Sequence, residues 1–135
     1  MKLLIIIGLP GSGKTTYFNQ NLSDKFKFYD DFVSNIFDGK LVSDLKKKEN
    51  DICVADPRLC NFQIFNRAIN IFLQYVSKND IDIILFENDK DKCIINANKR
   101  GSRFVTKSIE FNSFIYNYDN YSEYNCKLVP VYSIN

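Results

Sequence analysis

The fold is decided by residues 3–16, LLIIIGLPGSGKTT. The apolar run Leu3–Ile7 is typical of a strand that is buried on both faces of a parallel sheet. Three glycines follow within six residues, and Lys14–Asn21 then has the character of a helix. A strand, a glycine-rich turn and a helix in this order predict the start of an α/β domain with right-handed crossovers.

The rest of the chain repeats this alternation. Apolar runs predict further strands, and the clearest helix has Phe62, Phe65, Ile69, Phe72 and Val76 along one face. We therefore expect one domain over residues 1–135, a three-layer α/β fold with a mostly parallel sheet of about five strands and helices on both faces. The expected strands are Lys2–Ile7, Lys25–Tyr29, Asp51–Ala55, Ile81–Phe86 and Lys127–Tyr132, the last at an edge because of Pro130; the expected helices are Lys14–Asn21, Asn61–Val76, Lys90–Asn98 and Ser108–Tyr118.

Composition excludes several classes of function. The 135 residues are 45% hydrophobic and 25% charged, with few glycines and prolines, so a single packed core is expected rather than a disordered chain. A net charge of +2 neither requires nor excludes a nucleic-acid partner. The chain has no histidine, so a general base has to be a carboxylate, and a Ser-His-Asp triad is impossible.

The cellular location is inferred from the same composition. The apolar run at the start is too short to span a membrane and lacks the pattern of a signal peptide, so we expect a cytoplasmic protein with no membrane partner. Its cysteines at 53, 60, 93 and 126 form no CxxC pair, which favours reduced, buried thiols over a metal site. The run Lys46–Lys48 is interpreted as a solvated helix face.

The segment Gly8–Thr15 matches the phosphate-loop pattern GxxxxGK[ST] in full, directly after a strand and before a helix. Its backbone N–H groups and the helix start predict a site for a nucleoside triphosphate. Lys14 is expected to contact the β and γ phosphates, and Thr15 to bind Mg²⁺. The alternative is a structural glycine-rich turn. The residues expected to contact the nucleotide within the loop are Gly8, Gly11, Ser12, Gly13, Lys14, Thr15 and Thr16.

Other motifs narrow the class of P-loop protein. The candidate strand Ile52–Ala55 is followed by one acid, Asp56, rather than the paired acids typical of a motor or AAA-type ATPase. Residues Asn98–Gly101 begin like the guanine signature of GTPases but lack its aspartate. A small kinase remains, and a kinase needs a carboxylate near the acceptor hydroxyl.

Three acidic positions are candidates for that carboxylate or for the metal. Asp30, with Asp31 beside it, follows the second strand and is our choice of base, with a helix N-cap as the alternative. Asp56 is assigned to Mg²⁺ or the acceptor, with a turn before Pro57 as the alternative. Glu87 is a weaker candidate at the end of its strand.

The basic segment Lys99–Arg103 lies between two expected helices and contains a glycine. Such a segment is suited to a lid that closes over the phosphates, and a guanidinium supplied in this way stabilises the charge of phosphoryl transfer. We assign Arg100 a catalytic role and Arg100 and Arg103 contacts to the nucleotide. A solvated basic loop is the alternative.

Together these segments resemble the bacteriophage polynucleotide 5′-kinases and related small P-loop kinases. GLPGSGKTT resembles their phosphate loop, KFYDD their segment with the catalytic base (Asp30), and Asn98–Gly101 with Val105 their lid, whose arginine corresponds to Arg100. The resemblance also implies that Asp56 lies near the acceptor. The sequence departs from the family at Val33, where the family has an arginine that grips the acceptor's phosphate, and at Asn96, where it has a second lid arginine.

The resemblance implies transfer of the γ-phosphate of ATP, with Mg²⁺, to the 5′-hydroxyl of DNA or RNA. Two alternatives stay open at this point. One is a kinase of a nucleoside, nucleotide or other small molecule, and the other is a non-catalytic ATP-binding module whose partner recognises the ATP-bound shape.

Overall fold

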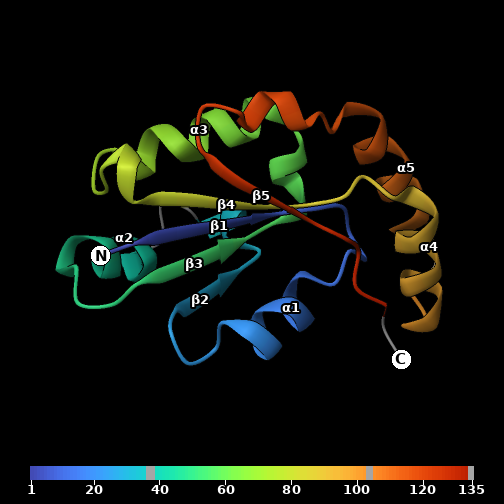
Figure 1. The fold of residues 1–135 in the computed structure, drawn as a ribbon, viewed down its shortest axis with the longest axis horizontal. Helices are drawn as coiled ribbons and strands as arrows, with labels where there is room; N and C mark the ends of the chain where they lie inside the picture. Colours follow the sequence, from blue (N-terminus) through green and yellow to red (C-terminus); the bar gives the residue numbers. More distant parts are fainter. Residues whose placement is uncertain (36–38, 103–104, 134–135) are drawn as a thin grey trace.

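The computed structural model describes residues 1–35, 39–102 and 105–133. Its core is a five-stranded, entirely parallel sheet in the order β2-β3-β1-β4-β5, with the phosphate-loop strand β1 in the middle (Figure 1). The strands are β1 (Leu3–Ile7), β2 (Lys27–Asp30), β3 (Ile52–Ala55), β4 (Ile81–Phe86) and β5 (Asn125–Val129). The helices are α1 (Lys14–Asn21), α2 (Gly39–Lys47), α3 (Phe62–Phe72), α4 (Lys90–Lys99) and α5 (Thr106–Ile115).

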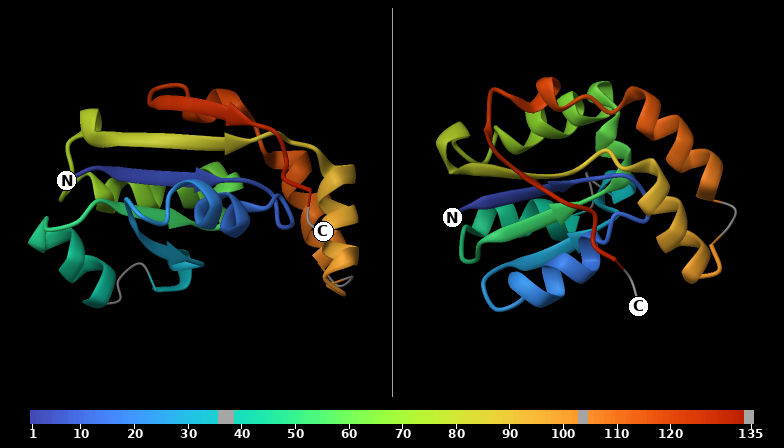
Figure 2. Two further views of the ribbon diagram at one scale, coloured as in Figure 1. Left: turned by 60° about the horizontal axis from the view of Figure 1, so that its bottom comes forward. Right: turned by 45° about the vertical axis from the view of Figure 1, so that its right-hand side comes forward.

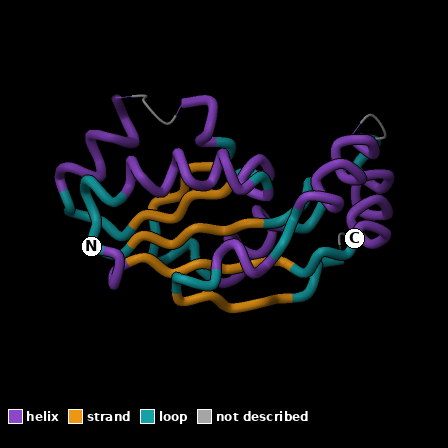
Figure 3. The backbone as a smooth tube through the Cα atoms, turned by 90° about the horizontal axis from the view of Figure 1, so that it is seen from above, coloured by secondary structure: helices purple, strands orange, loops and turns teal. Residues whose placement is uncertain are grey.

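The alternation of side chains in β1 divides the core into two layers. Leu3, Ile5 and Ile7 pack in one cluster with residues of α2, α3, α4 and α5. Leu4 and Ile6 point to the other face and pack with Tyr17, Phe18 and other residues against α1. All of β1 is buried, because helices cover both faces of the sheet (Figures 2 and 3). The expected three-layer α/β fold is confirmed.

All five strands have their carboxyl ends at one edge of the sheet, and α4 and α5 lie beyond this edge (Figure 1). The phosphate loop leaves β1 at the same edge, and β2 and β3 end there in register, since Asp30 pairs with Ala55 and Ala55 with Ile6. Ligands of open α/β sheets bind at such an edge. The fold therefore brings the candidate residues from β1, β2, β3 and α4 to one place.

The expected elements are found, with an end shifted by two or more residues in β2, β5, α3 and α5. The last strand ends at Val129 rather than Tyr132, because Pro130 has no N–H to continue the ladder; it is an edge strand, as expected. α3 ends at Phe72, and the stripe continues to the buried Val76 through a non-helical turn. The helix α2 was not predicted as a whole, although Leu41 and Leu45 bury one face of it. Lys46–Lys48 at its end are exposed, as expected.

The cysteine prediction is confirmed at three positions and wrong at the fourth. Cys53, Cys60 and Cys93 are free thiols in the core, and burial raises the pKa of both Cys60 and Cys93 to about 12, so these thiols stay protonated near neutral pH. Cys126 is exposed, because the edge strand β5 leaves its residues 125–128 uncovered. Within the described ranges, no helix has the length and apolar content needed to cross a bilayer.

Candidate active site

The phosphate loop connects β1 to α1, and two of its glycines are required by their surroundings. Gly11 and Gly13 have φ of 81° and 92°, in the left-handed region that other residues rarely adopt. A Cβ on Gly11 would lie 2.5 Å from the carbonyl oxygen of Cys93, and a Cβ on Gly13 would lie 2.6 Å from Cβ of Tyr132. The loop is therefore pressed between α4 and the segment after β5, which fixes the path of its backbone.

Lys14 is the first residue of α1, and its side chain turns back into the loop. Its Nζ donates hydrogen bonds to the carbonyl oxygens of Gly8 (2.9 Å) and Leu9 (2.9 Å) and to Oγ of the buried Ser12 (3.2 Å). Burial lowers the pKa of Lys14. The ammonium group is thus held inside the loop, at the position from which it would meet a polyphosphate.

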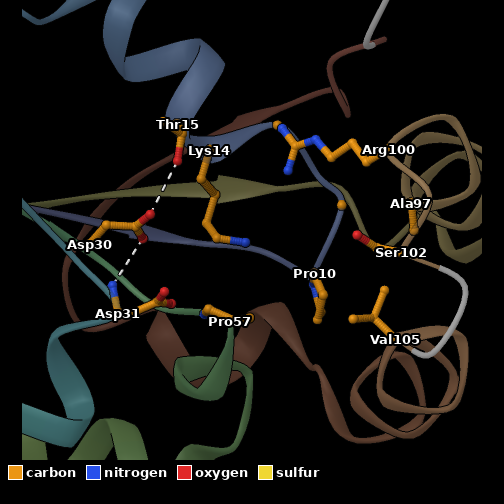
Figure 4. Close-up of a pocket in the computed structure, with 12 residues that line it drawn as sticks. Pro10, Lys14, Thr15, Asp30, Asp31, Pro57, Ala97, Arg100, Ser102 and Val105 are labelled. Atoms are coloured by element: carbon orange, nitrogen blue, oxygen red, sulfur yellow. Dashed lines mark hydrogen bonds between the residues drawn. The ribbon is translucent and has the colours of Figure 1, made fainter.

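The predicted base and the predicted metal ligand touch each other. The hydroxyl of Thr15 donates to Asp30 Oδ2 over 3.2 Å, and Asp30 Oδ1 accepts the backbone N–H of Asp31 at 2.9 Å (Figure 4). Asp31 has a positive φ of 50°. Partial burial is the main cause that raises the pKa of Asp31, and the nearby charge of Asp30 is the second. Asp30 itself is exposed at the end of β2. The alternative role of Asp30 as an N-cap is not observed, because the Val33 amide in the following turn donates to Asp56 instead.

These side chains border one pocket of about 220 Å³ (Figure 4). The segment after α4 supplies one wall, with the side chain of Arg100 extending toward the phosphate loop. The position of this segment between α4 and α5 is as expected for a lid, whereas Arg103 lies outside the described residues. The predicted loop residues Gly8 and Ser12 are buried below the pocket, and Thr16 is half-buried in α1. The lining residues are Pro10, Gly11, Gly13, Lys14, Thr15, Asp30, Asp31, Pro57, Ala97, Arg100, Ser102 and Val105.

The assignment of Asp56 to Mg²⁺ or the acceptor has to be corrected, because Asp56 does not line this pocket. Its carboxylate is fully buried, and both oxygens are used: Oδ1 accepts from the backbone N and Nε of Arg58, and Oδ2 from Arg58 Nη2 (2.7 Å) and the Val33 amide (3.0 Å). Four hydrogen bonds leave no oxygen facing the pocket. The alternative of a turn residue before Pro57 is the one observed, since Asp56 caps the short helix η2 (Pro57–Cys60). The weaker candidate Glu87 is half-buried after β4 and does not line the pocket.

The contacts of Asn96 and Tyr132 with the phosphate loop were not predicted from the sequence, in which Asn96 was only a departure from the family's second lid arginine. The buried amide of Asn96 donates to the carbonyl oxygens of Gly11 (2.8 Å) and Tyr132 (2.6 Å), and the Tyr132 N–H donates to the Ser12 carbonyl (3.0 Å). Three segments far apart in the chain are thus joined at the phosphate loop. The signal for Asn96 was its spacing, because it shares the buried face of α4 with Cys93 and Ala97. For Tyr132 the sequence carried no signal.

Comparison with known proteins places the chain in a family. No protein-family model matches it. It is 33% identical over 135 residues to a viral relative, uncharacterized protein R277 of Acanthamoeba polyphaga mimivirus, and the match covers 97% of both chains. The chain belongs to the R277 family. The match spans the sheet, the phosphate loop and the segment between α4 and α5, so the comparison concerns the whole domain of this R277-family chain.

The fold of this R277-family chain is that of small P-loop kinases. A gluconokinase from Sinorhizobium meliloti 1021 superposes with a TM-score of 0.64, covering 98% of this chain and 84% of the gluconokinase, at 8% sequence identity. At this identity the likeness concerns the fold alone. It confirms the expected kinase-like architecture and, of the resemblance to small P-loop kinases, the part that concerns the fold.

Proposed function

We propose that this chain is an ATP- and Mg²⁺-dependent phosphotransferase that moves the γ-phosphate to a hydroxyl group, with the 5′-hydroxyl of a polynucleotide as its acceptor. The observation that carries the proposal is the contact of Thr15 with Asp30 in a pocket that also contains Lys14 and Arg100. A phosphate-binding lysine, a hydroxyl ligand for magnesium, a carboxylate and a guanidinium are the parts that phosphoryl transfer requires.

The residues present fit a polyphosphate with its metal. Gly13 precedes α1 without a side-chain cap, so the first amides of the helix are available to anionic oxygens. Thr15 is exposed at the pocket and has the hydroxyl that holds Mg²⁺ in such loops. When bound, Mg²⁺ neutralises charge on the β and γ phosphates.

The roles of the side chains follow from their positions. Lys14 binds the phosphates from inside the loop. Asp30 accepts the proton of the acceptor hydroxyl and orients its oxygen toward the γ-phosphate. Arg100, on the opposite wall, stabilises the negative charge that spreads over the γ oxygens during transfer. The polynucleotide acceptor is supported by the resemblance of the loop, the Asp30 segment and the lid segment to phage polynucleotide kinases.

The decisive experiment has two stages. Calorimetry at millimolar magnesium tests binding of ATP and of GTP, and transfer from γ-labelled ATP is then measured with 5′-hydroxyl DNA and RNA oligonucleotides. Nucleosides, nucleotides and gluconate, the last because the structural neighbour is a gluconokinase, form the small-molecule panel. If phosphate is transferred only to a compound of the small-molecule panel, the acceptor is a small molecule and not a polynucleotide. Tight ATP binding without transfer to any acceptor would favour the non-catalytic binding module.

A further inference from the structure

A second cavity, of about 600 Å³, lies beside the active-site pocket. It is bordered by α3 and by the two short helices η1 (Phe32–Asn35) and η2. The chain passes directly from one site to the other: Asp31 and Pro57 line the pocket, and Val33 and Arg58 line the cavity. A molecule in this cavity would therefore lie close to Asp30, the proposed base. Its walls combine apolar side chains with two cations, Arg58 and Arg67.

Arg58 is held in a fixed orientation. Its guanidinium donates to both oxygens of the buried Asp56 and, over 2.6 Å, to Oγ of Ser34. A guanidinium has five N–H donors, and these contacts use one on each nitrogen. One N–H on each terminal nitrogen is left over, so the guanidinium can still donate charge-assisted hydrogen bonds to a phosphate or carboxylate in the cavity. Asp56 therefore has a positioning role toward Arg58.

Arg67 adds a second positive charge to the cavity. It is exposed on α3, next to the buried Ala68, and it forms no hydrogen bond or ion pair with any other residue in the described ranges. The lining of the cavity contains no acidic residue among the described ones. Since Asp56 compensates only Arg58, the described lining residues carry a net positive charge beside apolar surface from Val33, Ile64 and Ile71.

We propose that this two-arginine cavity binds the phosphate acceptor by an anionic group, a phosphate or a carboxylate, that lies away from the reacting hydroxyl. The inference rests on the proposed function and narrows its substrate class. The apolar wall contacts the body of the acceptor, while Arg58 and Arg67 fix its anionic end. Neutral alcohols lack this contact and are poor acceptors.

The test measures binding without ATP, so it does not depend on catalysis. Calorimetry compares adenosine 3′-monophosphate with adenosine, which tests a phosphate, and gluconate with glucose, which tests a carboxylate. We expect one anionic probe to bind about tenfold or more tightly than its neutral counterpart. Arg67→Ala should remove that advantage, whereas Lys25→Ala, which removes an exposed cation before β2, should leave it unchanged.

A second variant guards against loss of folding. Arg58→Lys keeps a cation beside Asp56 but loses the planar fork, so it should also weaken the anionic probe while circular dichroism stays that of the parent protein. Equal binding of both members in each pair, or unchanged binding in Arg67→Ala, would overturn the inference and leave the kinase proposal intact. Anion binding that depends on Arg67, without phosphate transfer, would instead overturn the kinase proposal and, with it, the identity of the bound anion as a phosphate acceptor.

Discussion

The Oγ1 atom of Thr15 lies 3.2 Å from Oδ2 of Asp30, so the first turn of α1 meets the end of β2 although 15 residues separate the two. This contact places the expected magnesium ligand and the expected base within hydrogen-bond reach of each other. It depends on the sheet order, because β3 separates β2 from β1 and sets Asp30 level with the end of the phosphate-loop strand.

Replacing Asp30 tests its role as base. Asp30→Asn keeps the size and can still accept the Thr15 hydrogen bond but cannot take a proton, so transfer should fall by about 10²–10⁴-fold while ATP affinity changes little. Single-turnover rates and calorimetry measure the two separately. Equal loss of both would remove the assignment.

Asp31→Asn is the matched control, because Asp31 lines the same pocket one residue further on. Its turnover should stay near that of the parent protein. If this variant, rather than Asp30→Asn, abolishes transfer, the base is Asp31.

Replacing Arg100 tests the lid segment. Arg100→Ala removes the guanidinium that extends toward the phosphate loop, so turnover should fall by about 10³–10⁵-fold, far more than ATP affinity. Lys99→Ala, an exposed cation at the end of α4, serves as control. If both variants reduce turnover by a similarly small factor, the segment is a solvated basic loop.

Local patterns of residues predicted three features: the phosphate loop, the alternation of strands and helices, and the acids at the edge of the sheet. The run 3–7 requires a buried strand, and the glycines at 11 and 13 require positive φ. The roles of Asp56 and Asn96 could not be predicted in this way. An acid after a strand can either point into the site or cap a turn. Asp56 caps the turn because Arg58, two residues further on, pairs with it and also donates to Ser34. The partners of Asn96 lie 85 and 36 residues away, so its contacts exist only in the folded chain.

The Asp56–Arg58 pair predicts large effects of both single variants. Arg58→Ala leaves a fully buried carboxylate without its cation and should lower the free energy of unfolding by about 3–5 kcal/mol. Asp56→Asn sets a buried amide NH2 against two N–H donors, because both oxygens of Asp56 only accept, and should also cost about 3 kcal/mol or more. Urea unfolding measures both, and a loss below about 1 kcal/mol in either variant would contradict the structural role.

Asp56→Asn also checks the corrected metal assignment. Because both oxygens of Asp56 are occupied within the protein, the magnesium concentration needed for half-maximal ATP binding should not change in this variant. Thr15→Ala, which removes the exposed hydroxyl in the pocket, should raise it. A raised requirement in Asp56→Asn would restore the carboxylate as a metal ligand.

Asn96 should act on the shape of the phosphate loop. Asn96→Ala leaves the carbonyls of Gly11 and Tyr132 without this donor, so we expect a loss of about 1–3 kcal/mol in the free energy of unfolding and weaker ATP binding. Asn98→Ala, exposed two residues later, is the control and should be neutral. Weaker ATP binding at unchanged stability would assign Asn96 to the nucleotide itself.

Lys14 makes nucleotide binding depend on pH. Burial lowers the pKa of Lys14 in the free protein, whereas the negative charge of a bound polyphosphate stabilises the ammonium and raises it. Between the two pKa values, ATP binding should therefore take up protons, and the uptake should grow from neutral toward alkaline pH. Without ATP, Lys14 binds fewer protons in the folded protein than in the unfolded chain. Its contribution to the free energy of unfolding therefore rises with pH between the pKa values of the two states.

Calorimetry in two buffers of different ionisation enthalpy measures the proton uptake on ATP binding. Lys14→Arg, which stays charged throughout, should abolish it. Binding heats that are independent of the buffer at every pH would show that the phosphates do not contact Lys14.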